Sequence, residues 1–150
     1  MSQESNDTSV VDTTLSEMLG YRLKRAYMTL QPAAQEALAE LDLRVLSFSC
    51  LCQIADNGGV SQSALAEALR IERSNLVTVI DELETRGLIA RNKVPGDRRR
   101  HALTATVEGV ALRDRAVRHV KDREAARVAH FTAADRDLLY AALDRLEGRG

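Results

Sequence analysis

The sequence predicts a mainly helical protein with a small β-hairpin set among its helices. Gly and Pro are scarce, at 8 and 2 of 150 residues, whereas Ala, Leu, Arg and Glu are abundant, and this balance favours helices. Apolar residues recur at three- and four-residue steps over most of the chain, as on the buried face of a helix. Residues 88–94 and 99–104 instead read as two strands around Pro95-Gly96-Asp97-Arg98, which is typical of a turn.

Length and composition predict one globular domain over residues 12–150, preceded by a disordered tail over residues 1–11. Hydrophobic residues make up 45% of the chain and charged residues 29%, which suits a folded protein with one core. No apolar run approaches the ~20 residues that span a bilayer. The polar start of the chain also has no apolar signal core. We therefore expect a soluble, cytoplasmic protein that does not enter a membrane.

The central stretch 61–104 predicts two short helices and then the hairpin. Ser61 has the position and chemistry of an N-cap for a helix over Gln62–Leu69. After a turn at residues 70–72, a second helix is expected from Arg73 or Ser74 to about Arg86, ended by a left-handed cap at Gly87. Its buried face comprises Leu76, Val79, Ile80 and Leu83. Together with the hairpin, this is the plan of a winged helix-turn-helix, and we assign residues 43–106 to it.

The two ends of the chain carry apolar helical stripes with less obvious partners. Residues 12–42 read as helix with a break or a new start at Pro32. A long helix is expected over 107–131, with an interrupted stripe of valines that begins at Val107. Thr132–Asp135 resembles a capping box ahead of a last helix rich in leucine. Because a second copy could bury these stripes, residues 12–42 and 107–150 are expected to form a homodimer.

The outward face of the second central helix offers side chains that suit base edges in the major groove. Asn can pair bidentately with adenine, and a Val or Thr methyl can pack on a thymine methyl, while an Arg at the helix start suits a phosphate. The candidate DNA contacts on the two helices are Ser61, Arg73, Ser74, Asn75, Val77 and Thr78.

The hairpin carries most of the local positive charge, although the net charge of the chain is −1. Close together lie Arg86, Arg91, Lys93, Arg98, Arg99 and Arg100, opposed there only by Asp97. Arg98 or Arg99 at the tip can place a guanidinium in a narrow, negative minor groove. Asp97 can brace one of these arginines in a bidentate pair. The sequence thus predicts a double-stranded DNA-binding protein.

Three other functions fit the sequence less well. The histidines His101, His119 and His130 are widely spaced, and neither a metal-site pattern nor a phosphate-binding glycine loop is present, so no catalytic residue, metal or cofactor is expected. Single-stranded nucleic acid would need stacking aromatics, which are only 3% of the chain. A protein partner alone would not require the arginine cluster.

From Leu15 to Leu146 the chain resembles the MarR family of bacterial transcriptional regulators. The resemblance is carried by residues 61–66, 71–77, 81–89 and 95–100, and by Asp97 and Arg99, which occupy the Asp-x-Arg signature of the family's wing. One departure is Arg70, where the family usually has Gly; a left-handed Arg there costs roughly 1 kcal/mol. The resemblance implies a homodimeric repressor that binds a palindromic operator and, in many members, leaves DNA when an aromatic or phenolic acid binds between the dimer region and the DNA-binding lobe.

Two triggers for release are open at this point. The candidate effector contacts offer aromatic faces and cations on a helix expected to run beside the DNA-binding lobe; they are Tyr21, Arg22, Arg25 and Tyr27. Such residues suit a small organic acid, for example an aromatic one, or its coenzyme A thioester. The alternative is oxidation of Cys50 or Cys52, as in the thiol-based members of the family. That trigger requires an exposed, acidified thiol, and the apolar setting of both cysteines argues against it.

Overall fold

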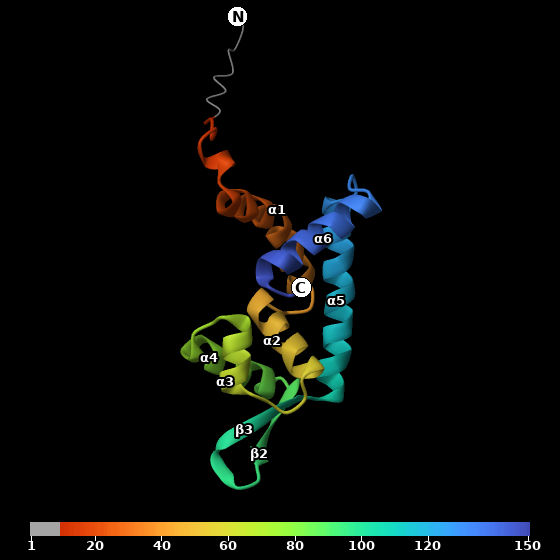
Figure 1. The fold of residues 1–150 in the computed structure, drawn as a ribbon. Coiled ribbons are helices and arrows are strands. Elements are labelled where there is room, and N and C mark those ends of the chain that lie inside the picture. The colour runs from red at the N-terminus through yellow and green to blue at the C-terminus, as the bar shows by residue number, and fades with distance from the viewer. Residues whose placement is uncertain (1–9) are drawn as a thin grey trace, which may run out of the picture.

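The computed structural model describes residues 10–150, and over this range it confirms a mainly helical fold with one small sheet (Figure 1). The elements, in order, are a 3-10 turn η1 (Leu15–Glu17), α1 (Leu19–Ala39), α2 (Val45–Asp56), β1 (Val60–Ser61), α3 (Gln62–Leu69), α4 (Arg73–Thr85), β2 (Ile89–Val94), β3 (Asp97–Ala105), α5 (Val107–Arg127) and α6 (Ala133–Glu147). The expected tail lies largely outside the described residues; Val10 and Val11 are described and exposed.

The sheet has three antiparallel strands in the order β1-β3-β2. The hairpin strands pair from Ile89 opposite Ala105 to Lys93 opposite His101, close to their predicted bounds. The short strand β1 was not predicted: Val60 pairs with Leu103 and so ties the start of α3 to the hairpin. Two residues are too few for a strand pattern to be visible in the sequence.

The core lies where α2, α3, α4 and the base of the hairpin meet, and the second half of α1 and the buried face of α5 close it. Its largest fully buried side chains include Leu51 and Ile54 of α2, Leu65 of α3, Ile80 of α4 and Leu103 of β3. The apolar faces predicted for α3 and α4 point into this core. The lobe therefore buries its apolar stripes within one chain.

The expected break at Pro32 was wrong, since α1 continues through it to Ala39. A proline inside a helix lacks one N–H and crowds the preceding turn, which costs about 3 kcal/mol. The turns that follow compensate by packing, because Ala33, Ala37 and Leu38 are all buried. Tertiary burial therefore outweighs the local signal.

The long helix α5 begins at Val107 as predicted but ends at Arg127, four residues early, ahead of a turn over residues 128–130. Its buried face matches the predicted valine stripe only in part, since Val120 is buried and Val110, Val117 and Val128 are half-buried. Val107 is 84% exposed, whereas the helix buries Gly109, Leu112, Ala116 and Val120. Small residues allow close approach: a Cβ built on Gly109 would lie 2.0 Å from the carbonyl oxygen of Leu88.

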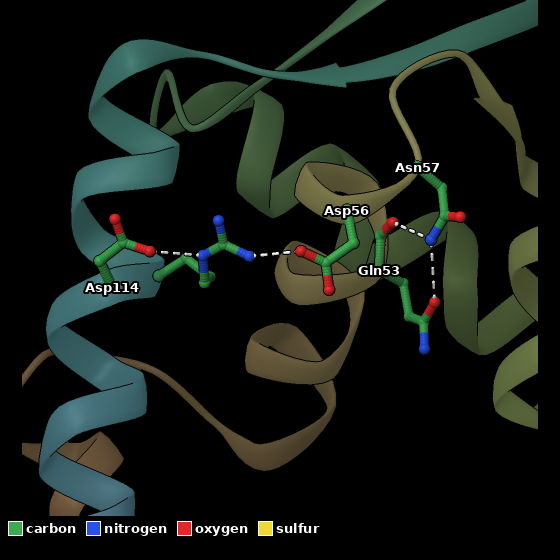
Figure 2. Close-up of polar contacts among 5 residues, drawn as sticks. Gln53, Asp56, Asn57 and Asp114 are labelled. Atoms are coloured by element: carbon green, nitrogen blue, oxygen red, sulfur yellow. Dashed lines mark hydrogen bonds and ion pairs between the residues drawn. The ribbon is translucent and has the colours of Figure 1, made fainter.

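Ion pairs fasten α5 to both α1 and α2. On α1, Glu36 and Glu40 accept from the Arg123 guanidinium. On α2, Asp56 lies 2.6 Å from Arg113, whose Nε donates to Asp114 at 2.7 Å, so that the two carboxylates flank one guanidinium (Figure 2). The lobe is thereby fixed to the base of the long helix.

The last helix differs from the others because none of its residues is buried in the single chain. Its predicted capping box is confirmed: Thr132 Oγ1 accepts from Asp135 N at 3.1 Å, and Thr132 N donates to Asp135 Oδ2 at 2.8 Å. Leu138 and Leu146 are 68% and 58% exposed. Over residues 10–150, no helix combines the length and apolar character that a membrane span requires.

Candidate nucleic-acid interface

The helix-turn-helix is built as the sequence predicts. Ser61 caps α3, its hydroxyl accepting from Ala64 N at 3.1 Å. Arg70 ends this helix with φ 52° and ψ 48°, the left-handed conformation expected where the family usually has Gly. Its neighbour Ile71 then donates its N–H to Ala66 O at 3.0 Å, which closes the turn ahead of α4. The turn thus accepts a strained arginine at a cost of roughly 1 kcal/mol.

Helix α4 separates a buried face from an exposed one. Leu76, Val79, Ile80 and Leu83 are buried, while the predicted DNA contacts Ser74, Asn75, Val77 and Thr78 are all exposed. Val77 is 43% exposed, and within residues 43–106 it is the single large hydrophobic side chain left so open to solvent. An isolated apolar side chain among polar ones on an outward helix face suits contact with a thymine methyl.

The strand pairing is irregular at the wing tip, where the arginines are exposed to solvent. Lys93 pairs with His101 and Val94 pairs with Asp97, so β3 has residues 98–100 with no partners on β2. The side chains of all three residues, Arg98, Arg99 and Arg100, are exposed. An extra stretch of this kind twists a strand and redirects its side chains.

Asp97 braces the wing differently from the prediction. Its Oδ1 accepts the backbone N–H of Arg99 at 2.9 Å, and no guanidinium pairs with it over residues 10–150. The carboxylate therefore fixes the backbone of the turn, as Asp commonly does two residues ahead of an N–H. The arginine side chains stay available for a ligand.

A hollow of about 340 Å³ brings together the start of α3, the first half of α4 and the wing. It is lined by Ser61, Gln62, Ser63, Arg73, Leu76, Val77, Arg99, Arg100 and His101. Four of the predicted DNA contacts thus share one surface. Asn75 and Thr78 line a second hollow of about 250 Å³, toward the start of α2. Arg73 is held by Ser63, to whose Oγ it donates at 2.5 Å.

Two members of the predicted basic cluster face the protein instead of solvent. Arg86 donates to the carbonyl of Asp42 at 2.7 Å, and Arg91 forms ion pairs with Asp81 and Glu84 of α4. Both were predicted to belong to the basic surface, but their carboxylate and carbonyl partners lie far along the chain or on another element and leave no local signal in the sequence. The positive charge that faces solvent comes from Lys93 and the three wing-tip arginines.

The four candidate effector residues do not form one group. Tyr21 donates to Asp12 Oδ2 at 2.7 Å, which raises the pKa of its hydroxyl, and the Arg25 guanidinium lies 5.9 Å from the Tyr21 ring centre. Arg22 instead donates to Ser16 O at 3.5 Å. Tyr27 is six residues beyond Tyr21 and so projects from a different side of α1.

The start of α1 also lies away from the DNA-binding lobe, which corrects the expectation that these residues run beside it. In Figure 1 the beginning of α1 and the hairpin β2–β3 occupy opposite ends of the molecule. It is the second half of the helix, with Ala33, Ala37 and Leu38 buried, that packs into the fold. An amphipathic pattern gives the face of a helix but not the direction in which the helix runs.

The two cysteines are free and poorly suited to redox chemistry. Cys50 is fully buried and Cys52 is partly buried. Burial raises the pKa of each thiol to about 11. Both thiols are therefore protonated at neutral pH, whereas a redox sensor requires a thiolate.

Sequence reasoning missed the residues that join the interface to the long helix. Thr106 caps α5 by accepting from Gly109 N at 3.0 Å, and its hydroxyl donates to Gly87 O at 2.7 Å. Its N–H also donates to Leu88 O at 3.0 Å. The sequence signal was present, because Thr followed by a helical pattern is typical of an N-cap.

Comparisons with known proteins agree with this geometry. A model of the MarR family matches residues 43–101, the DNA-binding lobe. The putative transcriptional regulatory protein for the hcr operon of Thauera aromatica is 33% identical over 143 residues, which cover 95% of this chain and 86% of that protein.

Three solved structures share the fold. The transcriptional repressor CouR bound to a 23-mer DNA duplex is 36% identical, with 93% of this chain and 99% of that chain covered and a TM-score of 0.82. CouR from Rhodococcus jostii RHA1 bound to p-coumaroyl-CoA gives a TM-score of 0.78 at 29% identity, with 90% of this chain and 95% of that chain covered. The Mycobacterium tuberculosis protein Rv2887 in complex with salicylic acid gives a TM-score of 0.72 at 31% identity, with 86% of this chain and 96% of that chain covered. With its winged helix-turn-helix intact and relatives that match almost end to end, this chain belongs to the MarR family of DNA-binding transcriptional regulators.

Proposed function

We propose that this protein is a homodimeric, cytoplasmic repressor that binds a palindromic operator in duplex DNA and leaves it when a small organic acid binds. The observation that carries the proposal is the hollow in which Ser61, Arg73, Val77 and Arg99 share one surface. A recognition helix and a basic wing on one surface can contact adjacent grooves of the same duplex.

In this proposal α4 reads the bases and the wing binds the backbone and minor groove. Asn75 pairs with an adenine, and Val77 and Thr78 contact thymine methyls, while Ser74 supports them. Ser61 and Arg73 bind phosphates beside the major groove. Arg98 or Arg99 enters the minor groove from the exposed wing tip, on a backbone that Asp97 holds.

The test of base reading is Asn75→Ala on a duplex selected from random sequence by the wild-type protein. We expect a loss of about 1–3 kcal/mol of discrimination at one base pair in each half-site. Thr85→Ala is the matched control, because Thr85 is exposed on the last turn of the same helix. Equal loss of affinity on selected and random duplexes would contradict a base-reading role for Asn75.

The wing is tested by the salt dependence of binding. Arg98→Ala and Arg99→Ala should each weaken binding and lower the slope of log K against log salt by about 1, because each removes a charge that displaces counterions. Unchanged slopes in both variants would rule out wing contact with the DNA backbone.

The trigger we propose is an aromatic carboxylic acid or its coenzyme A thioester. Support comes from the salicylic acid and p-coumaroyl-CoA bound to Rv2887 and CouR. On this chain the candidate contacts are Tyr21 and Arg25, which lie together, with Arg22 and Tyr27 on other sides of α1. Coupling requires that the ligand prefers a spacing of the two lobes that DNA does not.

A thermal-shift screen with salicylate, p-coumarate and p-coumaroyl-CoA tests this trigger. A binding ligand should raise the melting temperature of the wild-type protein and weaken operator binding. Arg25→Ala should lose the shift, whereas Lys24→Ala, an exposed cation next to it, should keep it. An equal shift in both variants would place the ligand elsewhere.

A further inference from the structure

Arg91 is a cation of the wing that binds the recognition helix instead of solvent. It lies on β2, and its guanidinium forms ion pairs with Asp81 and with Glu84, the latter with Nε and Oε2 3.4 Å apart. Its side chain is 25% exposed, whereas those of the two carboxylates are 59% and 44% exposed. The cation is thus the more enclosed member of the cluster.

The arrangement constrains orientation as well as distance. Asp81 and Glu84 are three residues apart and so lie on one side of α4. The guanidinium donates a hydrogen bond to Asp81, whereas its Nε has no hydrogen-bond partner within residues 10–150 and is drawn to Glu84 by charge alone. Two carboxylates on either side of one planar group restrict its orientation more than a single carboxylate would. In the hairpin, Arg91 of β2 pairs with Leu103 of β3, which is fully buried. The backbone that carries Arg91 is therefore anchored in the core.

We infer that Arg91 is a positioning residue, which sets the angle between the wing and α4 so that both meet one duplex together. The wing-tip arginines lie beyond the paired part of the hairpin, and Asn75 lies at the other end of α4 from Glu84. A change of angle at Arg91 therefore moves the two contact regions relative to each other. This inference rests on the proposed function, because it concerns how the DNA-binding surface is held.

The cluster allows a test in which a positioning role and simple electrostatics predict opposite changes in the affinity for DNA. Asp81 and Glu84 are negative charges on the recognition helix, and removing negative charge near DNA should strengthen binding if only electrostatics counts. If they position the wing through Arg91, their removal should weaken binding. The variant is the double substitution Asp81→Asn/Glu84→Gln. Glu67→Gln is the matched control, because Glu67 is an exposed carboxylate on α3 for which no ion pair exists within residues 10–150.

The experiment measures affinity for the duplex selected by the wild-type protein, over a range of salt concentrations. We expect the double variant to bind about tenfold more weakly, because the wing must then be ordered on binding. Arg91→Ala should weaken binding to a similar extent with an unchanged salt slope, in contrast to Arg99→Ala, which lowers the slope by about 1. Glu67→Gln should bind as tightly as wild type or more tightly. Exposed ion pairs add little to folding, so circular dichroism melts of the variants should stay close to wild type.

Two results would overturn the inference. The first is a double variant that binds as tightly as wild type or better. The second is an Arg91→Ala variant whose salt slope falls by about 1, which would make Arg91 a phosphate contact. A wild-type protein that selects no duplex and shows no salt-dependent binding would instead refute the proposed function, and is distinguishable from both.

Discussion

The DNA-binding lobe and the terminal helices differ in where their apolar side chains go. In residues 43–106 the helices bury their stripes within the chain, and Val77 alone among the large hydrophobic side chains is left widely exposed. Outside the lobe many are exposed: Val10, Val11, Leu15, Met18, Leu19, Tyr27, Met28, Val107, Leu138, Leu139, Tyr140 and Leu146. The lobe buries its apolar stripes in one copy of the chain, whereas the ends leave many apolar side chains exposed.

This difference assigns different physical roles to the two regions. Large contiguous apolar patches are rare on monomeric proteins and mark interaction sites. The lobe presents instead charge and one apolar side chain, which is what a duplex requires. We therefore expect substitutions on the exposed apolar faces of the ends to change assembly. Substitutions in the lobe, at helix caps or where α5 packs on the lobe should instead change stability or DNA binding.

The largest effect is expected when charge is placed on α6. Leu138→Asp/Leu146→Asp should raise the dissociation constant of the dimer about a thousandfold, since it places carboxylates on a face that pairing would bury. Val107→Asp is the control, because Val107 is 84% exposed and belongs to the start of α5, where an acid suits the helix dipole. Sedimentation velocity at micromolar concentration should find monomers of the first variant alone. A wild-type protein that sediments as a monomer would contradict the dimer.

A smaller effect is expected where α5 meets the lobe. Gly109→Ala should lower the free energy of unfolding by about 1–3 kcal/mol, because its Cβ would lie 2.0 Å from the Leu88 carbonyl oxygen and the helix would have to move. Gly20→Ala is the matched control: nothing lies within 4 Å of that Cβ, and alanine favours a helix by about 0.5–1 kcal/mol. Urea unfolding measures both. Equal effects would contradict the close approach of α5 to the wing.

Removal of the two threonine N-caps should change the free energy of unfolding by less than the Gly109→Ala substitution does. Thr106→Ala removes a cap and a hydrogen bond to Gly87 at 2.7 Å, so we expect about 1–2 kcal/mol of destabilisation. Thr132→Ala removes the cap of α6, whose residues are all unburied in the single chain, and should cost about 0.5–1 kcal/mol. Thermal melts at one protein concentration compare them. A larger effect at Thr132 would mean that α6 contributes more to folding than its exposure indicates.

The smallest effect concerns the thiols. The pKa of both cysteines is raised to about 11. At pH 7 only about one thiol in ten thousand is therefore the reactive thiolate, and this fraction increases only as the pH approaches 11. Peroxide at neutral pH should therefore leave operator binding unchanged in wild type and in Cys50→Ser/Cys52→Ser alike. Release of the wild type alone would replace the ligand trigger with a redox one.

Features set by neighbouring residues were predictable from the sequence. The cap at Ser61, the turn at Arg70 and the capping box at Thr132 each depend on a few adjacent positions, and all were found in the structure. The buried face of α4 followed from its periodicity. These signals are local, so no knowledge of the rest of the fold was needed.

Features set by distant neighbours were not predictable. Pro32 stays helical because of what its turn packs against, and Arg86 and Arg91 turn inward because acceptors from other elements reach them. Gly109 is required by the Leu88 carbonyl, which lies 21 positions earlier in the chain. Residue type and spacing cannot reveal a partner that only the folded chain brings close.

The central claim is that two DNA-binding lobes, paired through the terminal helices, read one palindromic duplex. The direct test is the affinity of the wild-type protein for duplexes in which the two selected half-sites are moved apart. With centres about 10 base pairs apart, both recognition helices face successive major grooves, and binding should be tightest. Insertion of about 5 base pairs turns one half-site to the opposite face and should reduce affinity to that of a single half-site. Equal affinity at both spacings would contradict the account.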